Sequence, residues 1–321
     1  MSHHVLRWCL CLGAGAWALS CGDNGNGTNG GSCAGDKGKN DPTCQLLLPD
    51  GDPKAAGAAA DYSCLAKVTL ETPPDKDLII RGKTQQRLSN GDDEDKGGVT
   101  VEVWTDQTTL SEATRIATVT SDAAGDYEIE IPATAWASAS AKGVRVAWRI
   151  GSTDTVPTVE YNDPIPISEA QVDGTDPNKL ALEGLNRITV TRSTLQTIVS
   201  LLGITADYDK TKGIILGVVR DCKRREVENV SAGIVDAAGK PIGGHLLYYF
   251  RSKFPVIRSQ QPFTSDDGYF VLINVDPDTD ADVRVVGKLS GQETVLSRQV
   301  VPVSADTIVI ADFDPLPEPL K

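Results

Sequence analysis

The chain has 321 residues, a formal net charge of −13 and only 5% aromatic residues. At about 100 to 200 residues per domain, this length predicts two or three domains. Because 31 Lys and Arg are outnumbered by 44 Asp and Glu, the composition disfavours a protein that binds the phosphate backbone of nucleic acids.

Residues 1–20 predict an export signal. One firm positive charge, Arg7, precedes an apolar run from Trp8 to Leu19. That run has about 12 residues, whereas a membrane-spanning helix needs roughly 20. We therefore expect the segment to be removed on export.

The residues that follow resemble a bacterial lipoprotein box. Ala18-Leu19-Ser20 precede Cys21, with Ala at a position where that family more often has Leu. The resemblance implies that Cys21 is lipidated and becomes the new N-terminus, and that Gly22 after it favours the outer membrane of a Gram-negative cell. The alternative is an ordinary secretory signal followed by an incidental cysteine.

Residues 21–65 predict a flexible tether. Positions 22–40 are nearly all Gly, Asn, Asp, Ser and Lys, a composition that cannot bury a core. We expect a lipid-anchored protein of the cell envelope or cell surface whose folded part stands away from the membrane, with the membrane itself as one partner.

Four cysteines remain once Cys9, Cys11 and Cys21 are set aside: Cys33, Cys44, Cys64 and Cys222. An even number in an exported chain predicts two disulfides, with three possible connectivities. A metal site is the alternative, but these cysteines are at least 11 positions apart, unlike the short spacings of zinc ligands. The expected pairs are Cys33 with Cys44 and Cys64 with Cys222.

Two parts of the chain share one strand pattern. A Thr-Ser-Asp turn, then Gly, Tyr and a strand, occurs over 120–131 and again over 264–273. Neighbouring apolar segments also correspond: 77–82 with 212–219, 144–150 with 283–289, and 187–191 with 307–313. A repeat of this size indicates a duplicated domain. The predicted organisation is a first domain, a helical linker, a second domain and a C-terminal tail, over 66–191, 192–211, 212–315 and 316–321.

Each copy has six or seven short strands rich in β-branched residues and separated by Gly, Pro, Asp and Ser turns. This profile predicts an all-β protein with two tandem antiparallel β-sandwiches. In the strand at 99–106, the alternation places Val99, Val101 and Val103 inward, with Glu102 and Trp104 outward.

The linker contains one helical pattern. Leu195, Ile198, Val199 and Leu202 recur at helical spacing, and Gly203 is placed to end a helix. We expect a short junction helix over 193–202, with an eighth strand as the alternative.

The second copy resembles the carboxypeptidase regulatory-like domain, a transthyretin-type β-sandwich. The resemblance covers 212–313 well and 66–191 more loosely, because the first copy has one extra turn residue and the acidic insert 90–98. It implies an accessory or scaffold module without catalytic residues. The matching positions are Gly217, Val219, Thr264, Gly268, Phe270, Val275, Val283 and Val285.

Little in the sequence indicates catalysis, and no cofactor is predicted. His245 is the only histidine after export, and we expect it to be half-exposed at the start of a strand. The G-x-G-x-x-G match at 25–30 lacks the strand and helix of a dinucleotide site. A hydrolase that uses carboxylates alone is the competing hypothesis, and it requires a carboxylate pair about 5 to 10 Å apart in a cleft.

Two acidic clusters are weak calcium candidates, since Ca²⁺ takes six to eight oxygen ligands. Neither has the EF-hand spacing, so solvated turns are the main expectation. The clusters contain Asp92, Asp93, Glu94 and Asp95, and Asp276, Asp278, Asp280 and Asp282.

Carbohydrate binding is a further alternative, which requires exposed aromatic rings. Trp148 is in phase with Val144 and Val146, so it is expected in the core, whereas Trp136 is expected to be exposed and is the sugar-binding candidate. The function favoured by the sequence is a non-catalytic, lipid-anchored envelope module that binds an unknown envelope protein or glycan.

Overall fold

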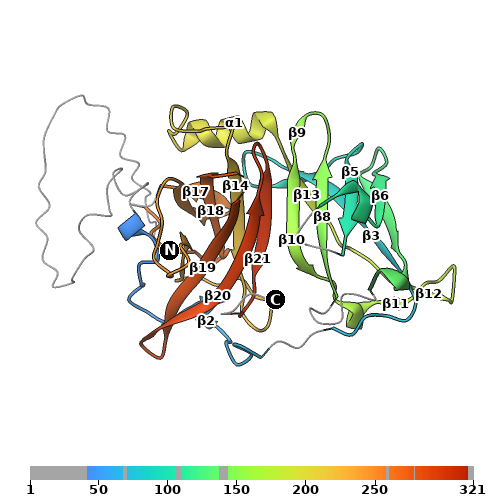
Figure 1. The fold of residues 1–321 in the computed structure, drawn as a ribbon, viewed down its shortest axis with the longest axis horizontal. Helices are drawn as coiled ribbons and strands as arrows, with labels where there is room; N and C mark the ends of the chain where they lie inside the picture. The colour runs from blue at the N-terminus through green and yellow to red at the C-terminus, as the bar shows by residue number, and fades with distance from the viewer. Residues whose placement is uncertain are drawn as a thin grey trace, which may run out of the picture. The chain divides into compact units, whose positions relative to one another are not determined.

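The computed structural model describes residues 42–67, 71–105, 110–136, 144–257, 260–277 and 279–316. The predicted signal, Cys21, Cys33 and Asp278 lie outside these ranges. No helix within them is both long and apolar enough to cross a membrane. The fold is all-β, as predicted, with two sandwich lobes that we call the first lobe (71–191) and the second lobe (212–316) (Figure 1).

The first lobe is built mainly from antiparallel strand pairs, with β12 and β13 parallel to β3. Its two sheets come together around an apolar core that includes Leu78, Val101, Ile131 and Trp148. Its strands are β3 (Asp77–Arg87), β4 (Asp93–Asp95), β5 (Thr100–Trp104), β6 (Ala117–Thr120), β7 (Asp126–Ile131), β8 (Arg145–Gly151), β9 (Thr155–Val156), β10 (Thr158–Pro164), β11 (Gln171–Val172), β12 (Lys179–Leu182) and β13 (Arg187–Thr191).

The second lobe has longer strands and a separate core around Ile215, Leu247, Phe270 and Val283. Its strands are β14 (Gly213–Val219), β15 (Ser231–Val235), β16 (Leu246–Arg251), β17 (Phe254–Val256), β18 (Tyr269–Val275), β19 (Thr279–Leu289), β20 (Gln292–Val303) and β21 (Ile308–Phe313).

Segments that correspond in sequence also take corresponding places in the sheets. β3 pairs antiparallel with β7, as β14 does with β18. β13 runs parallel to β3, as β21 does to β14. β5 pairs antiparallel with β8, as β15 does with β19. The pairing is therefore organised in the same way around both copies of the turn motif.

The two lobes share a sheet. β10 of the first lobe pairs in parallel with β21 of the second, which makes one sheet of nine strands in the order β17-β16-β18-β14-β21-β10-β8-β5-β6 (Figure 1). The register places Glu160 beside Ile310 on one face and Tyr161 beside Ala311 on the other. Tyr161 packs on the second-lobe core, whereas Glu160 is paired across the sheet with Trp148 of the first-lobe core. Each face of the shared sheet therefore packs on the core of one lobe and lies on the outside of the other lobe.

Trp148 is buried in the first-lobe core, as predicted. Trp104 and Glu102, which the alternation places on the outward face of their strand, are nevertheless buried too. Trp104 is fully buried, and its indole Nε1 donates a hydrogen bond to the Ser111 carbonyl over 2.8 Å. The Arg149 guanidinium covers the Trp104 ring at 5.2 Å and pairs with Glu102 at 2.5 Å. The Arg149 side chain and the 111–115 segment therefore cover the outward face of β5. The alternation of apolar and polar residues predicts which residues share a face, but not that another segment covers that face.

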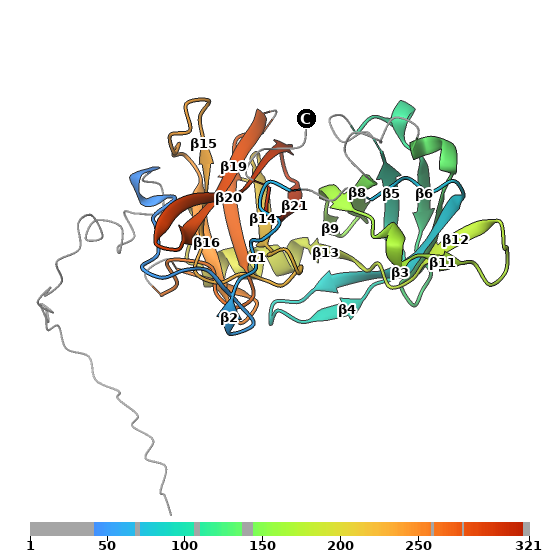
Figure 2. The ribbon, with the colours of Figure 1, turned by 90° about the horizontal axis from the view of Figure 1, so that it is seen from below.

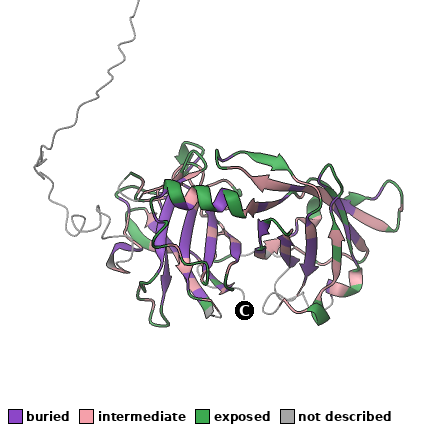
Figure 3. Ribbon diagram, turned by 90° about the horizontal axis from the view of Figure 1, so that it is seen from above, coloured by how far each residue is buried: buried purple, intermediate pink, exposed green. Residues whose placement is uncertain are grey.

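The predicted junction helix is present as α1 (Arg192–Leu201), and the eighth-strand alternative is wrong. Thr191 caps its N-terminus, with the side-chain oxygen accepting a hydrogen bond from the Thr194 N–H over 3.1 Å. Leu195 and Val199 pack on the outer face of the second lobe, in a third apolar cluster with Ile214 and Ile273. Figure 3 shows the exposed side of α1 facing away from the buried strands beneath it.

Residues 42–67, which we call the strap, are not the flexible tether that the sequence predicted for 21–65. The strap includes the strands β1 (Lys54–Ala55) and β2 (Ala58–Ala59) and packs on the second lobe through Ala55, Ala60 and Tyr62. The predicted disulfide between Cys64 and Cys222 is present. Cys44 is also disulfide-bonded, while its predicted partner Cys33 lies outside the described residues. Ala55 and Ala60 of the alanine-rich sequence therefore face the second-lobe core, whereas Ala58 and Ala59 are exposed.

Candidate functional site

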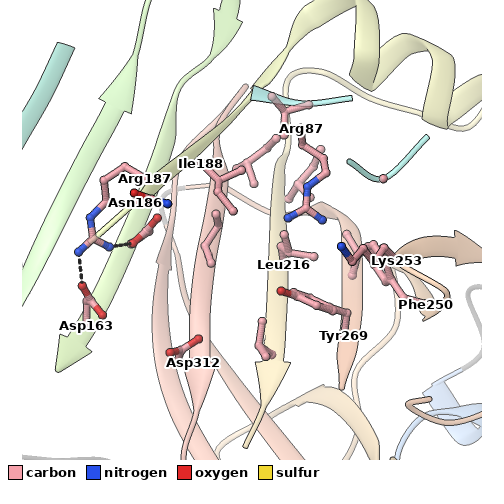
Figure 4. A pocket seen from close by; sticks show the side chains of 18 of the residues that line it. Arg87, Asp163, Asn186, Arg187, Ile188, Leu216, Phe250, Lys253, Tyr269 and Asp312 are labelled. Carbon is pink, nitrogen blue, oxygen red and sulfur yellow. Dashed lines mark hydrogen bonds and ion pairs between the residues drawn. The ribbon is translucent and has the colours of Figure 1, made fainter. Parts of the chain in front are cut away.

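A cavity of about 590 Å³ lies between the outer face of the second lobe and parts of the first lobe (Figure 4). We call it the interlobe pocket. Sites for small molecules typically have volumes of about 300 to 1,000 Å³, so its size is suitable for such a ligand.

The floor of the pocket is an apolar sheet surface. Alternate residues of the central strands point away from the second-lobe core and towards the cavity. Helix α1 covers only part of this surface, and Leu195 and Ile198 stand at its border. The strand sequence GIILGVV has no polar side because it is packed on both faces. The floor residues are Leu216, Val218, Val271 and Ile310.

The opposite wall comes from β13 and from two hairpin turns. β13 contributes Arg187 and Ile188, the β3–β4 turn contributes Leu88 and Gly91, and the β16–β17 turn contributes Lys253. Figure 2 shows the β3–β4 hairpin reaching from the first lobe to the second. A Cβ atom placed on Gly91, whose φ is +86°, would lie 3.1 Å from the Lys253 Cβ. The two turns are therefore in contact.

A buried ionic cluster stands at one side of the pocket. Arg187, whose side chain is 6% exposed, donates to Glu160 over 2.5 Å and to Asp163 over 2.9 Å. Its guanidinium also stacks on the Trp148 ring at 4.1 Å, and the Trp148 Nε1 donates to Asp163 over 2.8 Å. Arg187 thus binds both carboxylates, while the Trp148 indole stacks on Arg187 and donates a hydrogen bond to Asp163.

Burial makes two carboxyl groups of the pocket unusually weak acids. It raises the pKa of Glu160 to about 7, although the Arg187 charge opposes this. It also raises the pKa of Asp312 to about 6, against the opposing charge of Arg220. Burial by itself lowers the pKa of Arg187, but Asp163 and Glu160 raise it overall, so the arginine stays charged. The charge of the pocket therefore changes between about pH 6 and 7.

The acidic clusters expected from the sequence do not assemble into a metal site. Asp93 pairs with Arg87, its cross-strand partner in the β3–β4 hairpin, and Asp95 pairs with Lys83 of the same neighbouring strand. Asp92 accepts a hydrogen bond from Asn90. In the part of the chain that the structure describes, no three His, Cys, Asp or Glu side chains are grouped to hold a metal ion.

The second acidic cluster is dispersed in the same way. Asp276 pairs with Lys212 and Asp282 with Arg298, while Asp280 is an exposed residue of β19. The carboxylates described in the two clusters thus have basic partners or face solvent. Neither cluster directs several oxygens to one point where a cation could bind.

Trp136 is not exposed, contrary to the prediction. It is 1% exposed and belongs to the first-lobe core, in the short 3-10 helix Ala133–Trp136. Tyr248 and Tyr249, two aromatic residues of the second lobe, are fully buried. These rings are therefore unavailable for stacking on a sugar in this structure.

His245 is also buried, not half-exposed as predicted. The strap covers it, and its Nε2 lies 3.0 Å from the Gln45 Oε1. Burial lowers its pKa to about 4. Because the Gln45 oxygen can only accept, the neutral ring donates from Nε2.

Several charged residues of the pocket lie within strands and not in the loops where the sequence predicts candidate sites. The available signal was a charged residue inside an otherwise apolar strand: Arg187 in RITVT and Asp312 in TIVIADF. Charged side chains are rarely buried unless they are paired, so such positions point either to an ion pair or to a site. Here they do both, because they meet at one cavity.

Together the fold and the cavity define an all-β protein of the β-sandwich class with a ligand-sized pocket between two lobes. No family model matches the chain, and no curated protein does. Among solved structures, it is similar to the dioxygenase domain of a fusion protein from Streptomyces sp. SirexAA-E, with 15% identity, 44% of this chain and 92% of that chain covered, and a TM-score of 0.22.

Two further solved structures give similar values. The TIE protein of Bacillus anthracis has 6% identity, coverage of 74% of this chain and 34% of that chain, and a TM-score of 0.21. A mutant of the major pilin of Streptococcus pyogenes has 8% identity, coverage of 76% and 100%, and a TM-score of 0.17. Scores this low carry no inference about function, so the function must be argued from the pocket.

Proposed function

We propose that the chain is an exported envelope protein, lipid-anchored through Cys21, that binds a small molecule in the interlobe pocket. We also propose that its lobes are carboxypeptidase regulatory-like modules that have no catalytic role. The Cys64–Cys222 disulfide supports export, since disulfides persist mainly in oxidising compartments. The lipoprotein box supports the anchor, which makes the membrane a partner through lipid.

The interlobe pocket is the observation that carries the binding role. Its floor is the outer face of a sheet. In a β-sandwich this face is normally either polar or completely covered, whereas here it is apolar and partly open. Here α1 covers one part and the rest lines a concavity, where Leu216 and Ile310 keep partial solvent exposure. An apolar concavity with a few convergent polar groups is the usual form of a small-molecule site.

Binding can be tested with a neutral hydrophobic fluorophore, N-phenyl-1-naphthylamine, added to the purified mature protein. We expect saturable fluorescence that Leu216→Trp abolishes, because the indole fills the floor of the pocket. The matched control is Val172→Trp, since Val172 is 57% exposed and lies outside the pocket. Absence of saturable binding, or equal binding by both variants with unchanged melting temperatures, would refute the proposal.

The anchor is tested separately by metabolic labelling with a fatty-acid probe. Wild type should label and Cys21→Ser should not. Equal labelling of the two would remove the lipid anchor and leave the pocket proposal intact.

A carboxylate-dependent hydrolase is the second candidate, because Glu160, Asp163 and Asp312 all line one pocket. A pKa near neutral is what a general acid requires, and Glu160 has one of about 7. Against this, Arg187 engages both Glu160 and Asp163, an arrangement that favours a fixed ion cluster. The test is a panel of aryl glycosides and esters. Turnover lost in Glu160→Gln with probe binding retained would establish the enzyme.

A further inference from the structure

We infer that the ligand of the interlobe pocket is an amphiphilic anion, with an apolar body and a terminal carboxylate bound by Lys253, Arg87 and Tyr269. The inference rests on the proposed binding function and adds the chemical class of the ligand.

Three of the four carboxylates that line the pocket already have basic partners, and the fourth, Glu169, is exposed to solvent. Glu160 and Asp163 share Arg187. Asp312 lies 3.6 Å from the Arg220 Nε and 3.8 Å from the Arg224 Nη2. A cationic ligand would have to displace one of these arginines and leave it unpaired, which is costly for a partly buried group.

The cations on the other side of the pocket keep N–H donors available for a ligand. Arg87 donates to Asp93 through Nε and Nη2, over 2.5 and 3.1 Å, which fixes the guanidinium and leaves Nη1 free for another acceptor. Lys253 has no ion pair with any carboxylate in the described ranges, and its ammonium belongs to an exposed turn that lines the cavity.

The geometry directs these groups to a common place. In Figure 4 the Arg87 guanidinium and the Lys253 ammonium point into the same part of the cavity, above the Tyr269 ring. Arg87 and Arg220 both act electrostatically on the Tyr269 hydroxyl, although burial is the main reason that its pKa is raised. Two cations and a hydroxyl donor around one space are complementary to an anion.

The remaining lining of the pocket is apolar and is therefore suited to an apolar part of the ligand. From the cation pair, the floor continues along Leu216, Val271 and Ile310, with Ile188 on the opposite wall. The chain as a whole carries a net charge of −13, so a local pair of cations is not a consequence of general basicity. A carboxylate at the cation pair with an alkyl or aryl body on the floor uses both surfaces.

The inference is tested by displacement of N-phenyl-1-naphthylamine with three ligands of equal chain length: decanoate, decanol and decyltrimethylammonium. We expect decanoate to displace the probe at a concentration at least tenfold lower than decanol, and the cation to be weakest. Lys253→Gln should remove most of this preference without changing the affinity for decanol. Lys240→Gln is the control, because Lys240 is a surface lysine outside the pocket.

The outcomes separate the two proposals. If the probe does not bind saturably, the proposed function itself fails. If the probe binds and decanol competes as well as decanoate, or the cation competes best, the function stands and the anion inference is wrong. An equal loss of preference in Lys240→Gln would also overturn it, because the effect would then be one of overall charge. Arg87→Gln is a second test, checked for folding by its melting temperature because it also loses the Asp93 pair.

Discussion

Replacing His245 by Gln should make the protein more resistant to acid. His245 has its pKa lowered from 6.5 to about 4, first because burial disfavours the charged ring. Asp276 raises the pKa and Lys212 lowers it, and both effects are smaller. The unfolded chain therefore binds more protons than the native protein between pH 6.5 and about 4. Stability from this group is complete above pH 6.5 and is lost as the pH falls.

The size of the effect follows from these two values. A shift of one pKa unit corresponds to about 1.4 kcal/mol. From pH 7 to pH 5 wild type should lose about 2 kcal/mol through His245, and by pH 4 about 3 kcal/mol. Gln at this position has no titrating group, and its amide can donate to the Gln45 Oε1 as the ring does.

The measurement is urea unfolding of both proteins from pH 4 to 7.5, taken as the difference between them. The difference is needed because Glu160 has the opposite pH dependence. We expect the free energy of unfolding of His245→Gln, relative to wild type, to rise by about 3 kcal/mol between pH 7 and 4. Parallel pH profiles, or a His245 titration midpoint near 6.5 by NMR, would show that the ring is not buried as described.

Three other predictions concern stability. Glu160→Gln should flatten the pH profile: since burial raises the native pKa from 4.5 to about 7, wild type loses stability as the pH rises through that window, and an unchanged slope in urea unfolding would contradict this. Cys64→Ser opens a loop of 158 residues and should lower the free energy of unfolding by up to about 5 kcal/mol, and reduced wild type should lose at least as much because the disulfide of Cys44 opens as well. Gly217→Ala places a Cβ 2.1 Å from the Phe270 ring and should cost about 1 to 3 kcal/mol in thermal unfolding, whereas Gly174→Ala, with no atom within 4 Å, should cost much less.

The sequence was sufficient to predict the class of fold because the signals were local. Turn residues, β-branched runs and the helical spacing around Leu195 are properties of short segments, and the structure contains the expected sandwiches and helix. Cys64 and Cys222 were paired correctly by counting and position. None of these signals depends on contacts between distant strands.

The pocket was not predictable in this way. The β10–β21 pairing places first-lobe residues beside the floor, and no pattern within either strand encodes that pairing. The errors for Trp136 and His245 have a related cause: each is covered by a segment distant from it or irregular in structure, the strap in the case of His245. The sequence around each residue contains no signal of the segment that covers it.

The shared sheet also constrains how such a protein changes over evolution. Tandem modules can usually be exchanged or lost one at a time. Here each lobe supplies the edge neighbour of the other, because separating them would expose the edges of β10 and β21 to pairing with other molecules. Loss of either module would therefore carry a risk of aggregation, and the pair is expected to be inherited as one unit.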